Sequence, residues 1–378
     1  MIDRPRRRLR IFAILIAVGF GALAVASWWA GREDLRAGSK VTAEGGPALR
    51  IDDVPTTYHV VYRTENHAGN ALVVNTEKVW VMRPFTSRIE SWRGAPPGTE
   101  RLSVRQSSFG ILTNVSGSTT PLNIAVPPSL ASGDLRIDAA LAEAVSDRTV
   151  WRRERREVYG RACQVYRAGG PVFAGDLERY EPRSGEYADV CVDRTGLMLE
   201  EAWFSKGRLL NRRVATEVRT GEPIDPELLA IGVPEQEGFE RGAVERLVPG
   251  SPTEGLWVLD QVPRGFEVLG RYGVAIPPSA IPQTSQFLPI APTSTADVYV
   301  RGPDLLVVDQ DPSLEILTRQ EGRFERKIEL PNLKEAKLIV DARMNEVRGQ
   351  DEDGSIVRIY GTIAPSELIE LARGLRRA

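Results

Sequence analysis

The chain has 378 residues but only two cysteines, and each lies in a segment with strand character. Cys163 lies in YGRACQVYRAG, and Cys191 lies in ADVCVDRTGLMLEEAWF, where residues 193–196 are typical of a tight turn. Paired cysteines can bind a metal, act as a nucleophile or form a disulfide. The interval between these two is too wide for the close pairs of a zinc knuckle, and no pair of histidines accompanies it.

Other side chains that could perform chemistry are scarce. Histidine is the commonest general base at neutral pH, yet the chain has only His59, in a predicted strand, and His67, in a predicted turn. Two ligands facing each other across a hairpin, without a third, make a weak metal site. Adjacent acids such as Glu200 and Glu201 point to opposite faces of a strand, so they do not form an acid–base pair. With no serine elbow and no phosphate-binding loop, the sequence predicts a protein that is not an enzyme and has no cofactor; an unrecognised hydrolase is the disfavoured alternative.

The N-terminus predicts export from the cytoplasm. RPRRRLR precedes the uncharged stretch IFAILIAVGFGALAVASWWA, residues 11–30, which has the length of a membrane-spanning helix of about 20 residues. The arginines favour a cytoplasmic N-terminus, and Trp28 and Trp29 suit the opposite interface. We predict a single-pass anchor in the cell membrane at 1–31, with everything after it extracytoplasmic. The alternative is a signal peptide cleaved near Ala26, which would leave a periplasmic or secreted protein.

Export bears on the two cysteines, because thiols outside the cytoplasm are usually oxidised. We therefore predict a disulfide between Cys163 and Cys191, against the alternative of two free buried thiols. Closing a loop of this length would stabilise the fold by about 3–4 kcal/mol.

The segments that must position these residues are mostly strands. Residues 32–50 are polar and glycine-rich, as in a tether. Within 51–220, segments rich in Val, Ile, Tyr, Trp and Thr follow one another with short connections, which favour antiparallel pairing. The first of them are predicted at 57–63, 71–83, 87–93 and 101–115. Apolar residues at helical spacing predict one amphipathic helix over 133–147, with Asp134 as its N-cap.

A second unit follows an acidic linker rich in proline and glycine, residues 221–255, which has room for one helical turn. Residues 256–378 contain a further series of predicted strands. They end in APSELIELARGLRRA, predicted to be a helix with Pro365 in its first turn and Arg376 and Arg377 at its end. Both units have the α+β pattern, a series of strands with one or two helices.

The charge pattern gives no sign of a nucleic acid partner. The net charge is −2, and the strongest basic run after the N-terminus is WRRERRE, residues 151–157. Its interleaved acids favour a solvated strand, and the alternative is contact with anionic lipid headgroups or an acidic peptide.

Large apolar side chains are the remaining candidates for function. A half-open sheet that carried them on its concave face would form an apolar cavity; the alternative is that they pack against the 133–147 helix. The candidate wall residues are Trp80, Met82, Ile89, Trp92, Phe109, Leu197, Met198, Leu199 and Trp203.

Two segments carry a resemblance to a known family. VYGRACQVYRAG, followed by VCVDRTGLMLEEAWFSKGRLLNRRVATEV, resembles the periplasmic lipoprotein-carrier superfamily. It is similar in particular to the N-terminal domain of the sigma-E factor regulatory protein family, which protects an anti-sigma factor. The resemblance covers roughly residues 55–220, and VPRGFEVLGR and IYGTIAPSELIELARGL are similar to that family's second domain.

The resemblance implies a strongly curved antiparallel sheet, a half-barrel, wrapped over helices around an apolar cavity. It implies an acyl chain of a lipid or lipoprotein as the ligand and a transmembrane anti-sigma factor as a partner. We therefore expect a non-enzymatic exported binding protein with a lipid-binding domain at 51–220 and an interaction domain at 256–378. The alternative is a structural or signalling protein without a ligand, which scaffolds a membrane partner.

Overall fold

The computed structural model describes the chain in separate stretches: residues 39–43, 50–68, 71–94, 100–108, 111–116, 122–125, 134, 136, 138, 141, 150–168, 186–230, 243–247, 255–275, 293–311, 324–340 and 344–378. The predicted membrane segment, residues 11–30, and the candidate Phe109 lie outside them. Within the described stretches, no helix combines the length and the apolar composition needed to cross a membrane.

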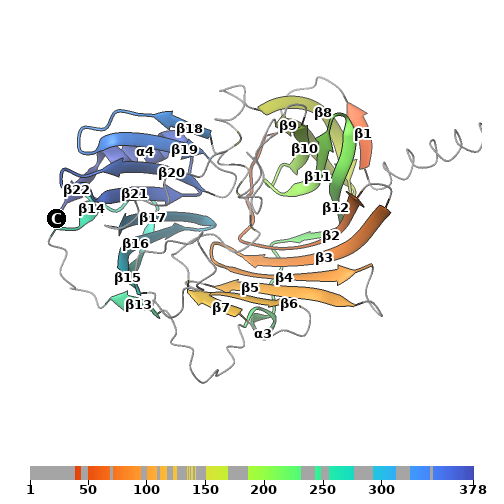
Figure 1. Cartoon of the computed structure of the whole chain (residues 1–378), viewed down its shortest axis with the longest axis horizontal. Coiled ribbons are helices and arrows are strands. Elements are labelled where there is room, and N and C mark those ends of the chain that lie inside the picture. The colour runs from red at the N-terminus through yellow and green to blue at the C-terminus, as the bar shows by residue number, and fades with distance from the viewer. Residues whose placement is uncertain are drawn as a thin grey trace, which may run out of the picture.

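The first structural unit is a 12-stranded antiparallel sheet with the order β1-β8-β9-β10-β11-β12-β2-β3-β4-β5-β6-β7. Its edge strands β1 and β7 do not pair with each other, and Figure 1 shows the β8–β12 half curling over the β2–β7 half. The strands are β1 (Ser39–Ala43), β2 (Thr57–Ala68), β3 (Ala71–Met82), β4 (Thr86–Arg93), β5 (Arg101–Ser108), β6 (Ile111–Ser116), β7 (Leu122–Ala125), β8 (Val150–Val158), β9 (Arg161–Ala168), β10 (Glu186–Asp193), β11 (Met198–Ser205) and β12 (Arg208–Thr220). This open, curved sheet confirms the predicted fold class.

Irregularities in the strand pairing accompany the curvature. The register shifts between β8 and β9, β10 and β11, β11 and β12, and β12 and β2. An extra residue in one strand bends that strand and increases its twist. At the β8 irregularity, the buried side chain of Gln164 donates hydrogen bonds to the carbonyl oxygens of Arg153 and Glu154 at 2.7 and 3.1 Å. The carbonyl groups of the bulge therefore have a hydrogen-bond donor within the sheet.

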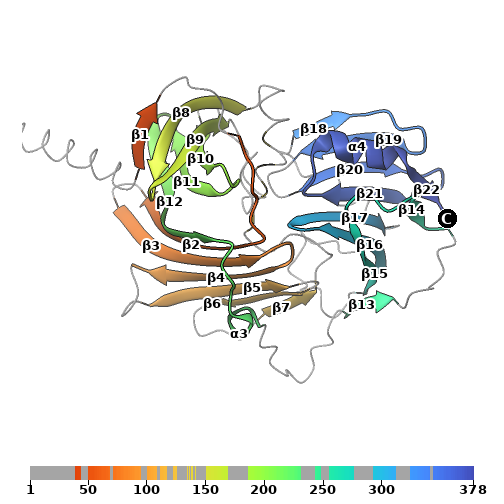
Figure 2. The ribbon, with the colours of Figure 1, turned by 180° about the vertical axis from the view of Figure 1, so that it is seen from behind.

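The second unit is an 8-stranded antiparallel sheet with the order β13-β15-β16-β17-β21-β20-β19-β18, beside a small sheet of β14 and β22. Its strands are β13 (Ala243–Leu247), β14 (Trp257–Leu259), β15 (Glu267–Ala275), β16 (Thr293–Arg301), β17 (Asp304–Asp311), β18 (Phe324–Lys327), β19 (Lys334–Val340), β20 (Asn345–Gln350), β21 (Ile356–Gly361) and β22 (Leu375–Arg377). Helix α4 (Pro365–Arg373) packs on this sheet through Leu368 and Ala372. Figure 2 shows α4 against β19 and β20.

Gly361 is required where β21 meets β17. A Cβ atom at this position would lie 2.2 Å from the carbonyl oxygen of Leu305, so any larger residue would force the two strands apart. The next residue, Thr362, ties the same strands together, because its hydroxyl accepts a hydrogen bond from the Leu305 amide at 2.9 Å.

Three short strands differ from the sequence prediction. β1 lies in the predicted tether, β13 lies in the predicted linker, and β22 replaces the expected last turn of the C-terminal helix. Each pairs with a strand that is distant in sequence, namely β8, β15 and β14. The predicted helical turn in the linker is confirmed as α3 (Pro226–Leu229), which Asp225 caps at the amide of Glu227.

Arg136 connects the two large sheets. The buried Arg136 guanidinium binds the Asp138 carboxylate at 2.9 Å and reaches the second sheet at Asp304, at 2.8 Å, and at the carbonyl oxygen of Pro303, at 2.9 Å. Burial alone would lower the pKa of Arg136, but its bonds to the two carboxylates raise it above its ordinary value. Phe85 adds an apolar contact, because it packs against a cluster of the second sheet that includes Val298.

Candidate functional site

The predicted disulfide is confirmed. Cys163 in β9 and Cys191 in β10 are joined, with their Cα atoms 5.4 Å apart, and both side chains are buried. They belong to an apolar cluster that also contains Leu197 and Leu199 of the candidate wall. The disulfide therefore fastens two neighbouring strands beside those residues.

The predicted tight turn between β10 and β11 is confirmed at residues 193–196. The buried Asp193 carboxylate accepts hydrogen bonds from the amide and hydroxyl of Thr195 and from the amide of Leu197, at 2.7–3.1 Å. Arg161 binds the same carboxylate at 2.6 Å. Gly196 has a φ of 77°, a conformation that favours glycine. These bonds fix where Leu197 enters the apolar cluster.

The eight candidate wall residues that the structure describes lie in different surroundings. Ile89, Leu197 and Leu199 belong to the disulfide cluster, whereas Met198 and Trp203 belong to a second cluster. Trp92 is partly buried, with the Arg101 guanidinium 5.9 Å from its ring centre, and Met82 is 44% exposed. The second cluster contains Leu141, Val150, Tyr166, Ala188, Val190, Val192, Met198 and Trp203.

The second cluster is where the predicted amphipathic segment meets the sheet. Asp138 and Leu141 are helical, as predicted, and Leu141 packs in the cluster with Met198 and Trp203. The predicted capping role of Asp134 rests on residues outside the described stretches; its carboxylate accepts hydrogen bonds from the Tyr58 hydroxyl at 2.6 Å and from Arg83 at 2.9 and 3.0 Å. This buried group fastens the segment to β2 and to the β3–β4 connection.

The Tyr58 hydroxyl remains protonated in this arrangement. Its burial, and next the negative charge of Asp134, raise the pKa of Tyr58 well above its ordinary value of 10.0. The neutral hydroxyl and the cationic Arg83 are therefore both donors to one carboxylate, which has the two acceptor oxygens they need.

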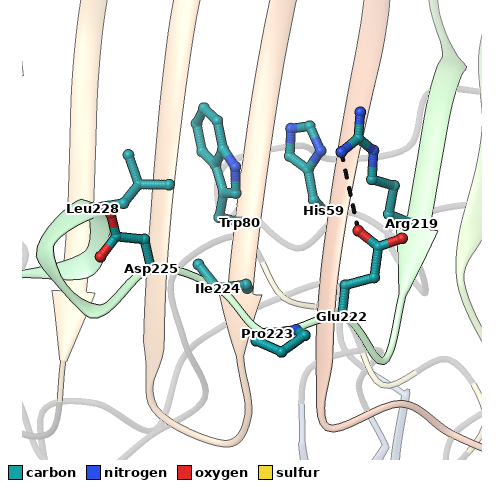
Figure 3. A pocket seen from close by; sticks show the side chains of 8 residues that line it. All are labelled: His59, Trp80, Arg219, Glu222, Pro223, Ile224, Asp225 and Leu228. Carbon is teal, nitrogen blue, oxygen red and sulfur yellow. Dashed lines mark ion pairs between the residues drawn. The ribbon is translucent and has the colours of Figure 1, made fainter.

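A separate pocket of about 140 Å³ lies against β12, β2 and β3, and Figure 3 shows its lining. His59 pairs across the strands with Trp80 and with Arg219, and the His59 and Trp80 rings stack with centroids 4.8 Å apart. The chain after β12 crosses below these side chains, and Glu222 in that segment pairs with Arg219 at 4.0 Å. The remaining lining residues are Pro223, Ile224, Asp225 and Leu228.

The segment after β12 is fastened across the sheet. Arg88 of β4 and Gln106 of β5 both donate to the carbonyl oxygen of Leu228 at 3.4 Å, and Gln106 also donates to that of Ala230 at 3.2 Å. The sequence prediction missed this pocket because residues 222–228 looked like part of a linker. Contacts with β4 and β5 hold this segment against the sheet, so that it forms one side of the pocket.

The electrostatics of the pocket keep His59 neutral. Burial lowers the pKa of His59 below its ordinary value of 6.5, and the charges of Arg219 and Lys78 lower it further. Glu217, whose carboxylate lies 3.8 Å from Nδ1, opposes this shift only in part. Nε2 is buried and has no hydrogen-bond partner. Ligand pockets for drug-sized molecules measure about 300–1,000 Å³, so this one is too small for a long acyl chain.

The adjacent acids on β11, predicted to point to opposite faces, have different partners. Glu200 is buried between Arg212, at 2.9 Å, and Arg156, at 3.2 Å, while Glu201 accepts a hydrogen bond from the Trp203 indole at 2.8 Å. Both terminal nitrogens of Arg212 are buried without a hydrogen-bond partner. The Glu200 group links β8, β11 and β12, so its arrangement is that of a structural ion-pair network.

His59 and His67 do not face each other, because both lie on β2. In the described part of the chain, no three side chains of His, Cys, Asp or Glu are grouped as metal ligands.

No protein-family model and no curated protein matches the sequence. Solved structures do match. The MucA/MucB complex of Pseudomonas aeruginosa is 17% identical over 85% of this chain and 93% of that chain, with a TM-score of 0.28. A LolA-superfamily protein of Nitrosomonas europaea is 10% identical over 48% and 92%, with a TM-score of 0.22. A DUF1329-family protein of Desulfovibrio piger is 9% identical over 47% and 91%, with a TM-score of 0.24.

These neighbours, MucB and a LolA-superfamily protein, match the family resemblance seen in the sequence.

Proposed function

We propose that this chain is a non-enzymatic, extracytoplasmic binding protein that holds the acyl chain of a lipid or lipoprotein against its first sheet. The observation that carries the proposal is the apolar cluster of Met198, Trp203 and Tyr166, covered by Leu141 from a helical segment. That segment is fastened to the sheet at Asp134, and the sheet remains open between β1 and β7. Outward movement of Leu141 would expose flexible and aromatic side chains, which suit varied apolar ligands.

Native mass spectrometry of the gently extracted full chain tests this proposal, together with displacement of a fluorescent fatty acid. We expect a co-purifying lipid mass, and saturable displacement that the Met198→Asp substitution weakens. The control is Met344→Asp, which changes the same residue type beside the second sheet. Finding neither a bound lipid nor any displacement would end the acyl-chain proposal.

A partner is part of the proposal. The sequence resemblance supports regulation of a transmembrane anti-sigma factor, with contacts made through the second sheet. Crosslinking of the full chain in native membranes, followed by identification of the captured proteins, tests this. A single-pass membrane protein in stoichiometric yield would support the partner, and its absence under conditions that capture a known membrane complex would count against it.

A second candidate function is a ligand-free scaffold. The observation in its favour is that Leu199 and Met198 are only 0% and 5% exposed, so the chain's own side chains cover them. A captured membrane partner without any lipid in the mass spectrum would favour this candidate.

A further inference from the structure

Two neighbouring hairpins of the first sheet expose aliphatic side chains at their ends. Leu72 and Val73, near the start of β3, project to opposite faces of the end of the β2–β3 hairpin and are 52% and 45% exposed. Leu210, near the start of β12, is 38% exposed. β2 lies between them, because Asn66 pairs with both Val73 and Asn211. We call Leu72, Val73, Leu210, Lys206 and Arg208 the hairpin patch.

The two hairpins are held side by side. The side-chain amide of Asn211 donates to the Asn66 side-chain oxygen at 2.5 Å, which ties β12 to β2 close to both ends. Lys206 and Gly207 form the β11–β12 turn with positive φ angles of 48° and 77°. Exposure of the aliphatic side chains is therefore set by the pairing of three adjacent strands.

The charges around these side chains are positive. Lys206 and Arg208 are exposed, and neither forms an ion pair with any described residue. The acids on nearby strands are already engaged: Glu65 binds Arg63 at 3.0 Å, and Glu77 binds Arg213 at 2.5 Å. Glu186, opposite Ser205, is half-buried.

We propose that the hairpin patch docks on an anionic lipid bilayer, with the aliphatic side chains at the headgroup boundary and Lys206 and Arg208 against the phosphates. Such binding increases with the buried apolar area and with attraction to anionic lipids. A stable protein interface takes about 800 Å² from each partner, far more than three aliphatic side chains provide. A bilayer has no such requirement.

The sequence outside the described residues supports a bilayer as the occupant. Residues 11–30 are uncharged, and only residues 31–38 separate them from β1 of the same sheet. Nine residue steps span at most about 30 Å, so an anchored chain keeps this sheet close to a membrane. In Figures 1 and 2 the β2–β3 hairpin extends away from the 8-stranded sheet, toward the side where β1 lies.

Hydrogen–deuterium exchange of the full chain in lipid nanodiscs tests the proposal. We compare discs of phosphatidylcholine alone with discs that also contain phosphatidylglycerol. In the anionic discs, amides of 71–73 and 205–211 should exchange about tenfold more slowly, and high salt should reverse the protection. Peptides around Val268, an exposed residue of the second sheet, should be unchanged.

Substitutions separate the contribution of the positive charges from that of the aliphatic side chains. Lys206→Glu with Arg208→Glu should remove the difference between the disc types, and Leu72→Asp should remove most of the protection in both. The matched controls are Arg264→Glu and Val268→Asp, at exposed positions of the second unit. Equal exchange in the two disc types overturns the proposal. Protection that depends on protein concentration instead of lipid charge also overturns it, because the hairpins would then contact a second copy.

Discussion

Cys163 and Cys191 are 28 residues apart in sequence and fasten β9 to β10 within a buried cluster. Replacing Cys163 with Ser should lower the free energy of unfolding by about 3–4 kcal/mol, because the unfolded chain regains the entropy of the open loop. Urea denaturation measures the change. Thiol titration of the unfolded wild-type protein without reductant should find no reactive group, and finding two would contradict the disulfide.

His59 should make stability depend on pH. Its pKa is lowered in the folded chain, so the unfolded chain binds the proton more tightly. The stabilising effect of neutral His59 is therefore complete above its ordinary pKa of 6.5 and is lost as the pH falls toward the folded value.

Chemical denaturation between pH 5 and pH 8 measures this dependence, since histidine is the side chain that ordinarily titrates in that range. The difference in stability between the wild type and His59→Gln should shrink as the pH falls. A difference that stays constant across the range would show that burial does not lower the histidine pKa. His67→Gln, on the same strand, is the control.

At the scale of elements, Asp134 fastens the helical segment to the sheet. Asp134→Ala leaves the Arg83 guanidinium buried without its carboxylate, and removing one partner of a buried pair costs about 3–5 kcal/mol. Thermal unfolding measures the loss. The control is Asp225→Ala, which removes only the exposed cap of α3 and should cost about 1 kcal/mol. An equal loss of stability in both variants would show that Asp134 does not hold the helical segment on the sheet.

The strands that the sequence predicted well are those with local signals. β2, β3 and β4 begin within one residue of their predicted positions, because alternating β-branched and aromatic residues end at clear turns. β1 was missed because five residues of a polar segment become a strand only against β8. Pairing with a distant strand leaves no periodic signal in so short a stretch.

The candidate site also has features that the sequence predicts from local signals and features that it does not predict. The disulfide and the turn at 193–196 followed from residue types and from export. The wall residues were chosen by size and apolar character, which cannot tell the two sides of a bulged strand apart. Leu197 and Met198 are consecutive, yet they lie in different clusters.

At the scale of the whole molecule, Arg136 is the residue of the described stretches that joins the two sheets by hydrogen bonds. Arg136→Met removes its bonds to Asp304 and Pro303 while keeping an apolar stem. We expect the first sheet to unfold at a lower temperature than the second, so that calorimetry resolves two transitions where the wild type has one. The coupling weakens because, among the described residues, the bonds of Arg136 to Asp304 and Pro303 are gone and the apolar contact of Phe85 is left.

Arg301→Met is the matched control for this prediction. Arg301 binds the same Asp304 and also Glu367, both in the second unit. Its loss should lower the stability of that unit without separating the transitions. Separation of the transitions in both variants would mean that Asp304, and not Arg136, couples the sheets.

The pairing of β1 with β8 has a mechanical consequence. If the N-terminus is held in a membrane, a force on the protein first separates β1 from β8 and then passes along the chain to β2, which is paired on both sides. If the whole sheet unfolds, the covalent link from β9 to β10 withholds 28 residues from extension. In an optical trap, the oxidised chain should extend about 100 Å less than the reduced chain, at about 3.5 Å per residue. Tension on the anchor would thus detach the edge of the sheet and leave the rest folded.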